Sequence, residues 1–313
     1  ADGPPWFQVG RYRLDGVRYV GSPFMDPDVR VARMDAAGID VQVLSPNPLT
    51  YLHFIPAEDA IRFCRVHNDA LAAVVGRHPA RLAAFAALPV QDPAAAVDEL
   101  ERSVAELGFL GGYVGTDSPR PLDSRDFDPL YEACVRLDVP LFVHPAPAGI
   151  DGPPGDPNLK AFDLDVVIGF AAQEALAVAR LVYGGVLDRH PALDVCLSHG
   201  GGSTAFLFGR MAAAARKRPW SPPELRAEGA FEERVRRIWF DTHLNGDAQL
   251  AMLKALVGEE RLVYGTNFAG WDAPDAHDPH GQDPRLSDNA RRLLRVPPAA
   301  AGRRTDAAGR TIA

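Results

Sequence analysis

The sequence predicts an α/β protein, a (β/α)8 TIM-type barrel. Short apolar runs rich in β-branched and aromatic residues alternate with longer amphipathic or alanine-rich stretches. This alternation predicts a parallel sheet flanked by helices. Several apolar runs end in a polar residue, as strands do at the functional end of a barrel. The 313 residues are enough for such a domain, which needs roughly 250.

Seven strands are expected along the chain. They cover residues 39–45, 81–88, 109–115, 140–144, 193–199, 237–243 and 261–267. The helices expected between them cover residues 56–78, 93–107, 126–137, 169–191 and 246–258. The helix at 93–107 illustrates the signals, because it begins after a proline and ends at Gly108.

The first strand of the barrel is not visible. Residues 1–30 are rich in glycine and proline and are expected to form an N-terminal insertion segment. The chain begins with Ala1, so we expect strand one to lie upstream of it; the alternative is an open barrel of seven strands, which would leave an unpaired edge. The barrel domain is expected over 1–295, and 296–313 is expected to be a flexible tail.

Composition narrows the class of protein. The net charge is −8 and no block of lysine or arginine occurs, which argues against nucleic-acid binding. No apolar run of about 20 residues predicts a membrane span. Cys64, Cys134 and Cys196 are scattered, and we expect them to be core residues of a protein in a reducing compartment, the cytoplasm.

Two histidines stand at strand ends. His144 closes the run VPLFVHP, and His199 closes LDVCLSHGGG. An imidazole at a barrel mouth is a natural ligand for a divalent metal, which favours His144 as a ligand. The three glycines after His199 allow close approach of a ligand, and their amides could bind an anion.

Two further strand ends carry polar residues. The expected strand at 237–243 ends in DTH, where Asp241 and His243 point to the same face because side chains alternate. Both could face a pocket; alternatively, Asp241 supports another residue and His243 lies at the rim. Asn267 ends the last strand, and asparagine is a weaker metal ligand than aspartate and cannot act as a base near neutral pH.

At these motifs the chain resembles the amidohydrolase superfamily. Within it, the chain is similar to the 2-amino-3-carboxymuconate-6-semialdehyde decarboxylase family over about residues 5–295. The most specific matching stretches are MDAAGIDVQVLS and SHGGGSTAFLFGR, accompanied by LFVHP and LVYGTNF.

The resemblance implies a set of site residues. The family's metal site combines a His-x-His pair on strand one, the histidine matched by His144, and an aspartate at the position of Asn267. It makes His199 the acid/base beside the metal and Arg18 a ligand of the substrate carboxylate. Arg210 would reach the pocket of a neighbouring subunit, which implies a homodimer.

The chain also departs from the family pattern. Asn267 replaces the aspartate, and Trp271 and Asp272 follow where the family has an aromatic-proline turn. Asn158 stands where the family has a pocket tryptophan, and His243 where it has a small residue. We expect Trp271 and His243 to contact the substrate, and the changes together favour a different substrate.

The expected function is metal-dependent, non-oxidative decarboxylation of a small unsaturated or aromatic carboxylic acid, with Zn²⁺ as the expected metal. Arg18 and Arg210 favour this reading, because a carboxylate takes bidentate partners. One alternative is a metal-dependent hydrolase of an amide, ester or lactone on the same barrel. Another is a metal-free, divergent or ligand-binding barrel, which Asn267 favours. The expected partners are a small carboxylate substrate and a second copy of the chain, with no nucleic acid or membrane.

Overall fold

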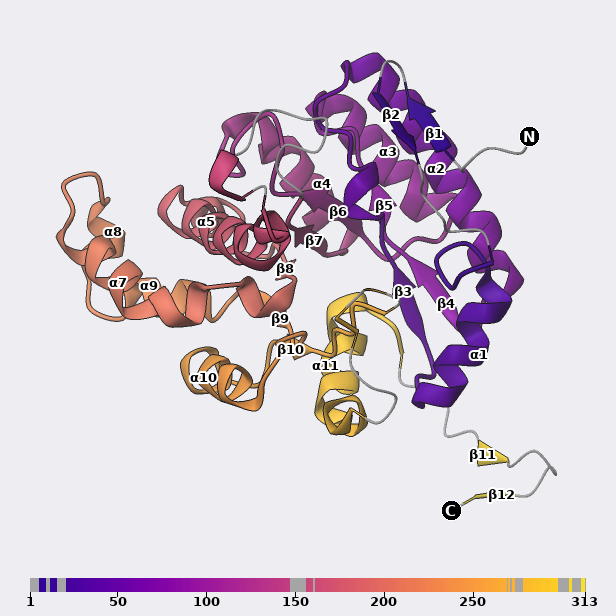
Figure 1. The fold of residues 1–313 in the computed structure, drawn as a ribbon. Coiled ribbons are helices and arrows are strands. Elements are labelled where there is room, and N and C mark those ends of the chain that lie inside the picture. The colour runs from indigo at the N-terminus through magenta and orange to yellow at the C-terminus, as the bar shows by residue number, and fades with distance from the viewer. Residues whose placement is uncertain are drawn as a thin grey trace.

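The computed structural model has the α/β barrel architecture that the sequence predicts. It describes residues 6–9, 12–15, 21–146, 156–159, 161–268, 270, 272–273, 278–297, 304–305 and 311–312. Parallel strands form an inner sheet and helices lie outside it (Figure 1). The strands are β1 (Trp6–Val9), β2 (Tyr12–Asp15), β3 (Gln42–Leu44), β4 (Leu82–Ala84), β5 (Ala86–Ala87), β6 (Gly112–Gly115), β7 (Leu141–His144), β8 (Val195–Leu197), β9 (Trp239–Asp241), β10 (Leu262–Val263), β11 (Arg304–Thr305) and β12 (Thr311–Ile312). The α-helices are α1 (Pro27–Ala37), α2 (Ala57–Arg77), α3 (Pro93–Ala105), α4 (Asp128–Leu137), α5 (Phe170–Tyr183), α6 (Val186–Arg189), α7 (Thr204–Lys217), α8 (Pro223–Arg226), α9 (Ala230–Val235), α10 (Asp247–Val257) and α11 (Pro284–Leu294).

All seven expected strands are present in one parallel series. β3 pairs with β4, and β5 to β10 pair in chain order, all parallel. β4 and β5 are halves of one predicted strand that is interrupted at Phe85. The Phe85 amide donates to the carbonyl of Leu44, whereas the amide of Ala86 turns to Gly111 on the other side. This exchange of partners joins β3 to the rest of the sheet.

The described part of the sheet has two edges. β3 and β10 each pair with one neighbour among the described strands. The hairpin of β1 and β2 is antiparallel and separate, and its Phe7 and Val9 pack against Leu52 and Ile55. A small cavity of about 40 Å³ lies between α1 and the segment after β10. The expected strand one upstream of Ala1 stays a prediction.

Three helices begin with the same local signal. Asp26, Asp92 and Asp283 each accept hydrogen bonds from backbone amides of the first turn, in α1, α3 and α11. Each is followed by a proline, which needs no amide partner at the first helical position. The Asp-Pro pair therefore marks these helix starts directly in the sequence.

The prediction of a single helix over residues 169–191 was wrong. The structure has two helices there, because α5 ends at Tyr183 and α6 begins at Val186. Gly185 has φ 69°, and a Cβ on Gly184 would lie 2.1 Å from a side-chain atom of Asp123. The close approach and the left-handed residue end the helix there.

The stretch Asp165–Tyr183 also corrects the expectation that no apolar run is long enough for a membrane span, since by length and composition it passes that test. A π-helical turn at Asp165–Gly169 leads into α5. The helix packs against α6 and α7 and buries Glu174, while Leu176 is exposed.

The three cysteines are buried and free, as predicted. Burial raises the pKa of the Cys64 and Cys134 thiols to about 12. Within the expected tail at 296–313, the described residues include the short antiparallel pair of β11 and β12.

A partly buried carboxylate gives the fold a testable pH dependence. Asp128 accepts hydrogen bonds from Arg189 at 2.9 Å, His190 at 3.0 Å and Arg125 at 3.2 Å. Burial alone would raise its pKa, but the bonds from His190, Arg189 and Arg125 outweigh burial and lower the pKa to about 2. Since this lies below the ordinary value of 3.8, the carboxylate stabilises the fold above about pH 4 and loses that effect as the pH falls towards about 2.

We therefore expect Asp128→Asn to lower the free energy of unfolding by about 1 kcal/mol at neutral pH, after allowance for solvent screening. The difference from the wild type should shrink as the pH falls below about 4. Urea denaturation at several pH values measures it. A loss that does not change with pH would contradict the ionic role of Asp128.

Candidate active site

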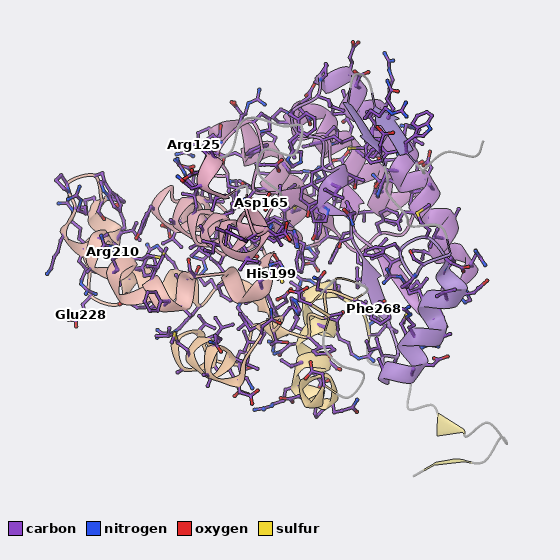
Figure 2. The ribbon with its side chains drawn as sticks, in the orientation of Figure 1. Arg125, Asp165, His199, Arg210, Glu228 and Phe268 are labelled. Atoms are coloured by element: carbon purple, nitrogen blue, oxygen red, sulfur yellow. The ribbon has the colours of Figure 1, made fainter. Side chains whose placement is uncertain are left out.

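Three histidines meet at one edge of the sheet. His144 ends β7, His199 follows β8, and His243 follows β9; the three strands are parallel neighbours, so their carboxyl ends meet. The ring centroids of His144 and His199 are 5.0 Å apart, and those of His199 and His243 are 5.5 Å apart. Figure 2 shows His199 where the strands converge. This edge is the candidate active site.

His144 is held as a neutral imidazole. Its Nδ1 donates to the carbonyl oxygen of Pro145 at 2.7 Å, which leaves Nε2 with the lone pair. Burial, reinforced by the nearby His199, lowers the pKa of His144 to about 3. A neutral imidazole whose other nitrogen is bound to a carbonyl is the form that ligates metals.

The surroundings of His199 raise its pKa, whereas those of His144 lower it. Its Nδ1 lies 2.8 Å from Oε1 of Glu174, which also accepts from Ser198 at 2.5 Å. Burial pulls the pKa of His199 down, but the hydrogen bond and charge of Glu174, helped by Asp241 and Asp272, raise it to about 9. The contact with Glu174 therefore favours the imidazolium form of His199, which is suited to donate a proton.

Glu174 is a functional residue that the sequence analysis missed. It is fully buried on α5, and its Oε2 has no hydrogen-bond partner within the described ranges. A signal was available: Glu174 is a lone charge in the apolar stretch AAQEALAVA. A buried carboxylate needs a partner, and the fold supplies His199.

The glycines after His199 do not offer their amides to an anion, contrary to expectation. The amide of Gly200 donates to Asp241 at 3.4 Å, and those of Gly201 and Gly202 donate to carbonyls of Ser198 and His199. All three glycines have positive φ, and a Cβ on Gly202 would lie 2.4 Å from a backbone oxygen of α5. The glycines are needed for this tight turn and its contact with α5.

Asp241 holds the backbone of the glycine turn that follows His199. Its carboxylate is buried and accepts from the backbone amides of Gly200 and of His243, the latter at 3.0 Å. A Cβ on Gly265 would lie 2.7 Å from its Oδ2, so glycine there makes room for the carboxylate. Burial raises the pKa of Asp241 despite the opposing effect of His199 and His243.

His243 is buried, so the rim alternative was wrong. Its Nε2 lies 3.1 Å from Oδ2 of Asp272, and the side-chain amide of Asn267 donates to Oδ1 of the same carboxylate. Burial opposes ionisation of Asp272, but these two hydrogen bonds keep its pKa below the usual value. Asn267 thus reaches the site through Asp272.

An aromatic wall lies on the other side of His144. The ring of Tyr113 stacks at 6.0 Å from His144, and Tyr51 and Phe170 approach edge-on at 6.3 and 5.7 Å. His53 stacks on Tyr51, and its Nδ1 lies 2.7 Å from Asp117. The sequence analysis missed this wall, because its residues come from different segments.

The remaining expected residues are not brought into the site by the described structure. Arg18 and Trp271 lie outside the described residues. Asn158 is exposed and bonds to Asp156. Arg210 is exposed on α7, well away from His199 in Figure 2.

A divalent metal is implied by the resemblance, and the residues fit it in part. His144 offers one neutral nitrogen, and Asn267 still has its amide oxygen. Both oxygens of Asp272 are taken by hydrogen bonds. Across the described residues, no group of three or more His, Cys, Asp or Glu side chains is placed to hold a metal, whereas a catalytic zinc takes three protein ligands. The described residues therefore supply part of a ligand set.

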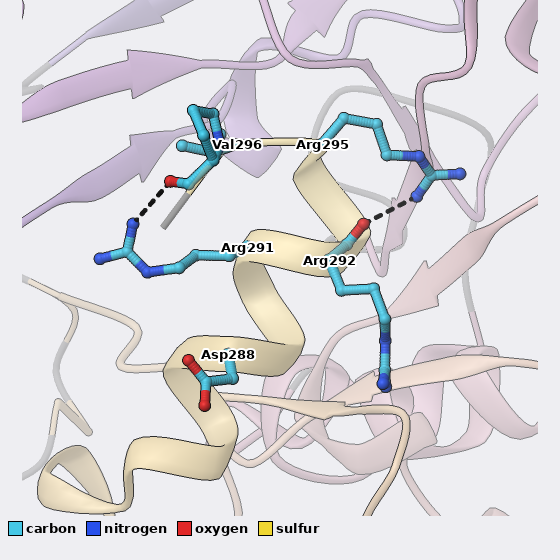
Figure 3. Close-up of a pocket in the computed structure, with 6 residues that line it drawn as sticks. Asp288, Arg291, Arg292, Arg295 and Val296 are labelled. Atoms are coloured by element: carbon cyan, nitrogen blue, oxygen red, sulfur yellow. Dashed lines mark hydrogen bonds between the residues drawn. The ribbon is translucent and has the colours of Figure 1, made fainter. Parts of the chain in front are cut away.

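A cavity of about 470 Å³ near the end of α11 belongs to the opposite end of the barrel (Figure 3). Its Arg295 pairs with Asp138 and Asp194, which precede β7 and β8. The histidines follow those strands. This arginine-lined cavity is therefore separate from the candidate active site.

Comparison with known proteins decides the family. A family model described as amidohydrolase matches residues 21–296. The chain belongs to the amidohydrolase family. The 2-amino-3-carboxymuconate-6-semialdehyde decarboxylase of Dictyostelium discoideum is 30% identical to this amidohydrolase over 258 residues, covering 82% of this chain and 70% of the relative. The gamma-resorcylate decarboxylase of Rhizobium radiobacter is 32% identical over 257 residues, covering 77% and 76%.

A solved structure agrees with this assignment. The dihydroxybenzoic acid decarboxylase of a Polaromonas species, with bound manganese and the inhibitor 2-nitroresorcinol, matches with a TM-score of 0.70 and 26% identity. The match covers 87% of this amidohydrolase and 86% of that chain. The relatives confirm the family and the decarboxylase resemblance, and this one carries a divalent metal.

Proposed function

We propose that this amidohydrolase is a metal-dependent, non-oxidative decarboxylase of a small aromatic or unsaturated carboxylic acid. The observation that carries the proposal is the His199–Glu174 pair facing the neutral His144. Decarboxylation breaks the bond between the carboxylate and its carbon, releases CO₂ and leaves an electron pair on that carbon. The carbon then takes up one proton, and the imidazolium of His199 is placed to supply it.

The aromatic wall supports a flat substrate. Tyr113, Tyr51 and Phe170 surround His144, and Phe170 also stacks on His199 with 6.1 Å between ring centroids. Stacked rings favour a planar, conjugated partner. When bound, a divalent metal held in part by His144 would attract the oxygens of the substrate carboxylate. Zinc, the expected metal, is proposed alongside manganese, because imidazole and amide oxygen are compatible with both.

The substrate carboxylate needs cations that the described part of the pocket does not provide. We propose Arg18 of the same chain and Arg210 of a second chain, in a homodimer. Arg210 lies one helical turn from Phe206, a residue that is 81% exposed. An arginine beside an exposed aromatic residue is typical of an interface. The buried free thiols are in keeping with the proposed cytoplasmic location.

The two alternatives make different demands on the site. A hydrolase would need a general base beside the metal, and the raised pKa of His199 makes it a poor base at neutral pH. A metal-free barrel is favoured by the incomplete ligand set in the described residues. The decarboxylase proposal combines the proton donor, the aromatic wall and the relatives.

The test measures CO₂ release from gamma-resorcylate and a panel of hydroxybenzoates, with added Mn²⁺ or Zn²⁺. We expect release that depends on the metal and stops with a chelator, and no hydrolysis of amide, ester or lactone probes. The metal is added in excess, because the described residues supply only part of a ligand set. Hydrolysis without CO₂ would overturn the proposal, and activity indifferent to chelators would favour the metal-free barrel.

A further inference from the structure

The loop after β10 folds back into the candidate active site. Asn267 has φ 37°, a left-handed conformation that asparagine tolerates better than most residues. The amide of Gly270 donates to the carbonyl of Asn267 at 2.7 Å, and a Cβ on Gly270 would lie 2.3 Å from the Asn267 side chain. This tight return brings Asp272 over Asn267, five residues after it.

Asp272 is a junction between two side chains. Its Oδ1 accepts from Asn267 and its Oδ2 from Nε2 of His243 at 3.1 Å. Its side chain is 14% exposed and that of His243 is 5% exposed. Because an ionised carboxylate only accepts hydrogen bonds, Nε2 of His243 carries a proton and points it at Asp272. Asp272 therefore fixes the tautomer of His243.

The site consequently holds two histidine–carboxylate pairs side by side. The His243–Asp272 pair adjoins the His199–Glu174 pair, with 5.5 Å between the two imidazole centroids. The backbone of His243 is also held, by its amide on Asp241. A histidine restrained at both its backbone and one ring nitrogen is preorganised to present the other nitrogen.

We propose that Asp272 is a positioning residue for His243, and that His243 so held orients a hydrogen-bonding group of the substrate beside His199. The proposal rests on the proposed function, since it assigns a role within the same site. Asn267 acts through Asp272 by anchoring its carboxylate. With both oxygens engaged, Asp272 serves the imidazole and not a metal.

The first experiment needs no substrate. Nitrogen-15 NMR of the histidine rings in the holoenzyme reports the tautomer of His243, assigned by its loss in His243→Gln. We expect a single tautomer protonated at Nε2 in the wild type and a mixture in Asp272→Asn. Asp288→Asn removes an exposed carboxylate of α11 and is the matched control, expected to leave the spectrum unchanged. An unchanged His243 signal in Asp272→Asn would overturn the proposal.

The second experiment uses gamma-resorcylate turnover. Asp272→Asn is expected to lower kcat by about 10–100-fold, the usual effect of removing a group that orients a functional imidazole. The double variant Asn267→Asp/Asp272→Asn keeps the net charge and one side-chain contact but gives His243 an amide partner. We expect it to stay as slow as Asp272→Asn. Recovery of wild-type kcat would show that charge alone matters and would overturn the positioning role.

The two arms separate this proposal from the proposed function. If the wild type releases no CO₂ from any probe but Asp272→Asn still changes the His243 tautomer, the decarboxylase proposal fails and the positioning of His243 stands. If turnover is seen and both Asp272 variants match the wild type, the positioning role fails and the decarboxylase proposal stands.

Discussion

Replacing His199 with alanine is expected to lower kcat by about 10²–10⁴-fold, the contribution of a positioned proton-transfer group. The physical reason is that the described site contains one imidazole held protonated by a buried carboxylate, with its pKa raised to about 9. His144 cannot replace it, because burial and the charge of His199 lower the pKa of His144 to about 3. Steady-state kinetics with the best substrate of the panel measures the loss.

Metal content distinguishes a proton donor from a ligand. We expect the His199→Ala protein to take up Mn²⁺ as the wild type does, as judged by elemental analysis after equilibration in the same buffer. Parallel loss of metal and activity would show that His199 is a ligand instead. His78→Ala is the matched control, since His78 lies at the end of α2 and pairs with Asp28 on the surface.

The same variant tests the proposed shared site. Mixed with Arg210→Ala, the His199→Ala protein should regain part of the activity through hybrid dimers, because each hybrid contains one intact site. Arg210 is exposed and away from its own His199 in Figure 2. A monomer in sedimentation would argue against this, as would absence of recovery when the subunits are known to exchange.

Replacing Glu174 with glutamine is also expected to lower kcat, through the charge of His199. Glutamine keeps the shape and the acceptor oxygen but removes the charge that raises the pKa of His199 above its ordinary value of 6.5. With a pKa near or below that value, only a small fraction of His199 is protonated near pH 8. We expect kcat to fall roughly 30-fold there.

The dependence of kcat on pH shows in which direction Glu174 shifts the pKa of His199. A proton donor supports activity below its pKa, so the wild-type rate should decline above about pH 9 and the Glu174→Gln rate at least about two units lower. Below both values the two proteins should converge. Glu132→Gln, on the exposed face of α4, is the matched control. A Glu174→Gln profile identical to that of the wild type would show that Glu174 does not govern the charge of His199.

Some features of the site were readable from local sequence. His144 and His199 each follow an apolar run, and strand periodicity places both at the carboxyl edge of a parallel sheet. The Asp-Pro helix starts are equally local, since the cap and its amides lie within three residues. Contacts over such short spans depend little on the rest of the chain.

Two predictions made from local sequence were wrong. The HGGG motif predicted free amides for an anion, but the fold turns them onto Asp241 and nearby carbonyls. His243 was open to being a rim residue, but it is buried beneath the loop that carries Asp272. In each case the decisive partner comes from another element, and glycine spacing or strand alternation carries no information about it.

The sequence by itself determined the barrel class, the seven strands and the strand ends that carry His144 and His199, because periodicity, capping and turn signals act over a few residues. Tertiary structure alone decided which histidine is charged and which is neutral. That depends on Glu174 reaching His199 across 25 residues and on the burial of His144 beside His199. Burial and pairing set the charge of an imidazole, and both exist only once distant segments have packed together.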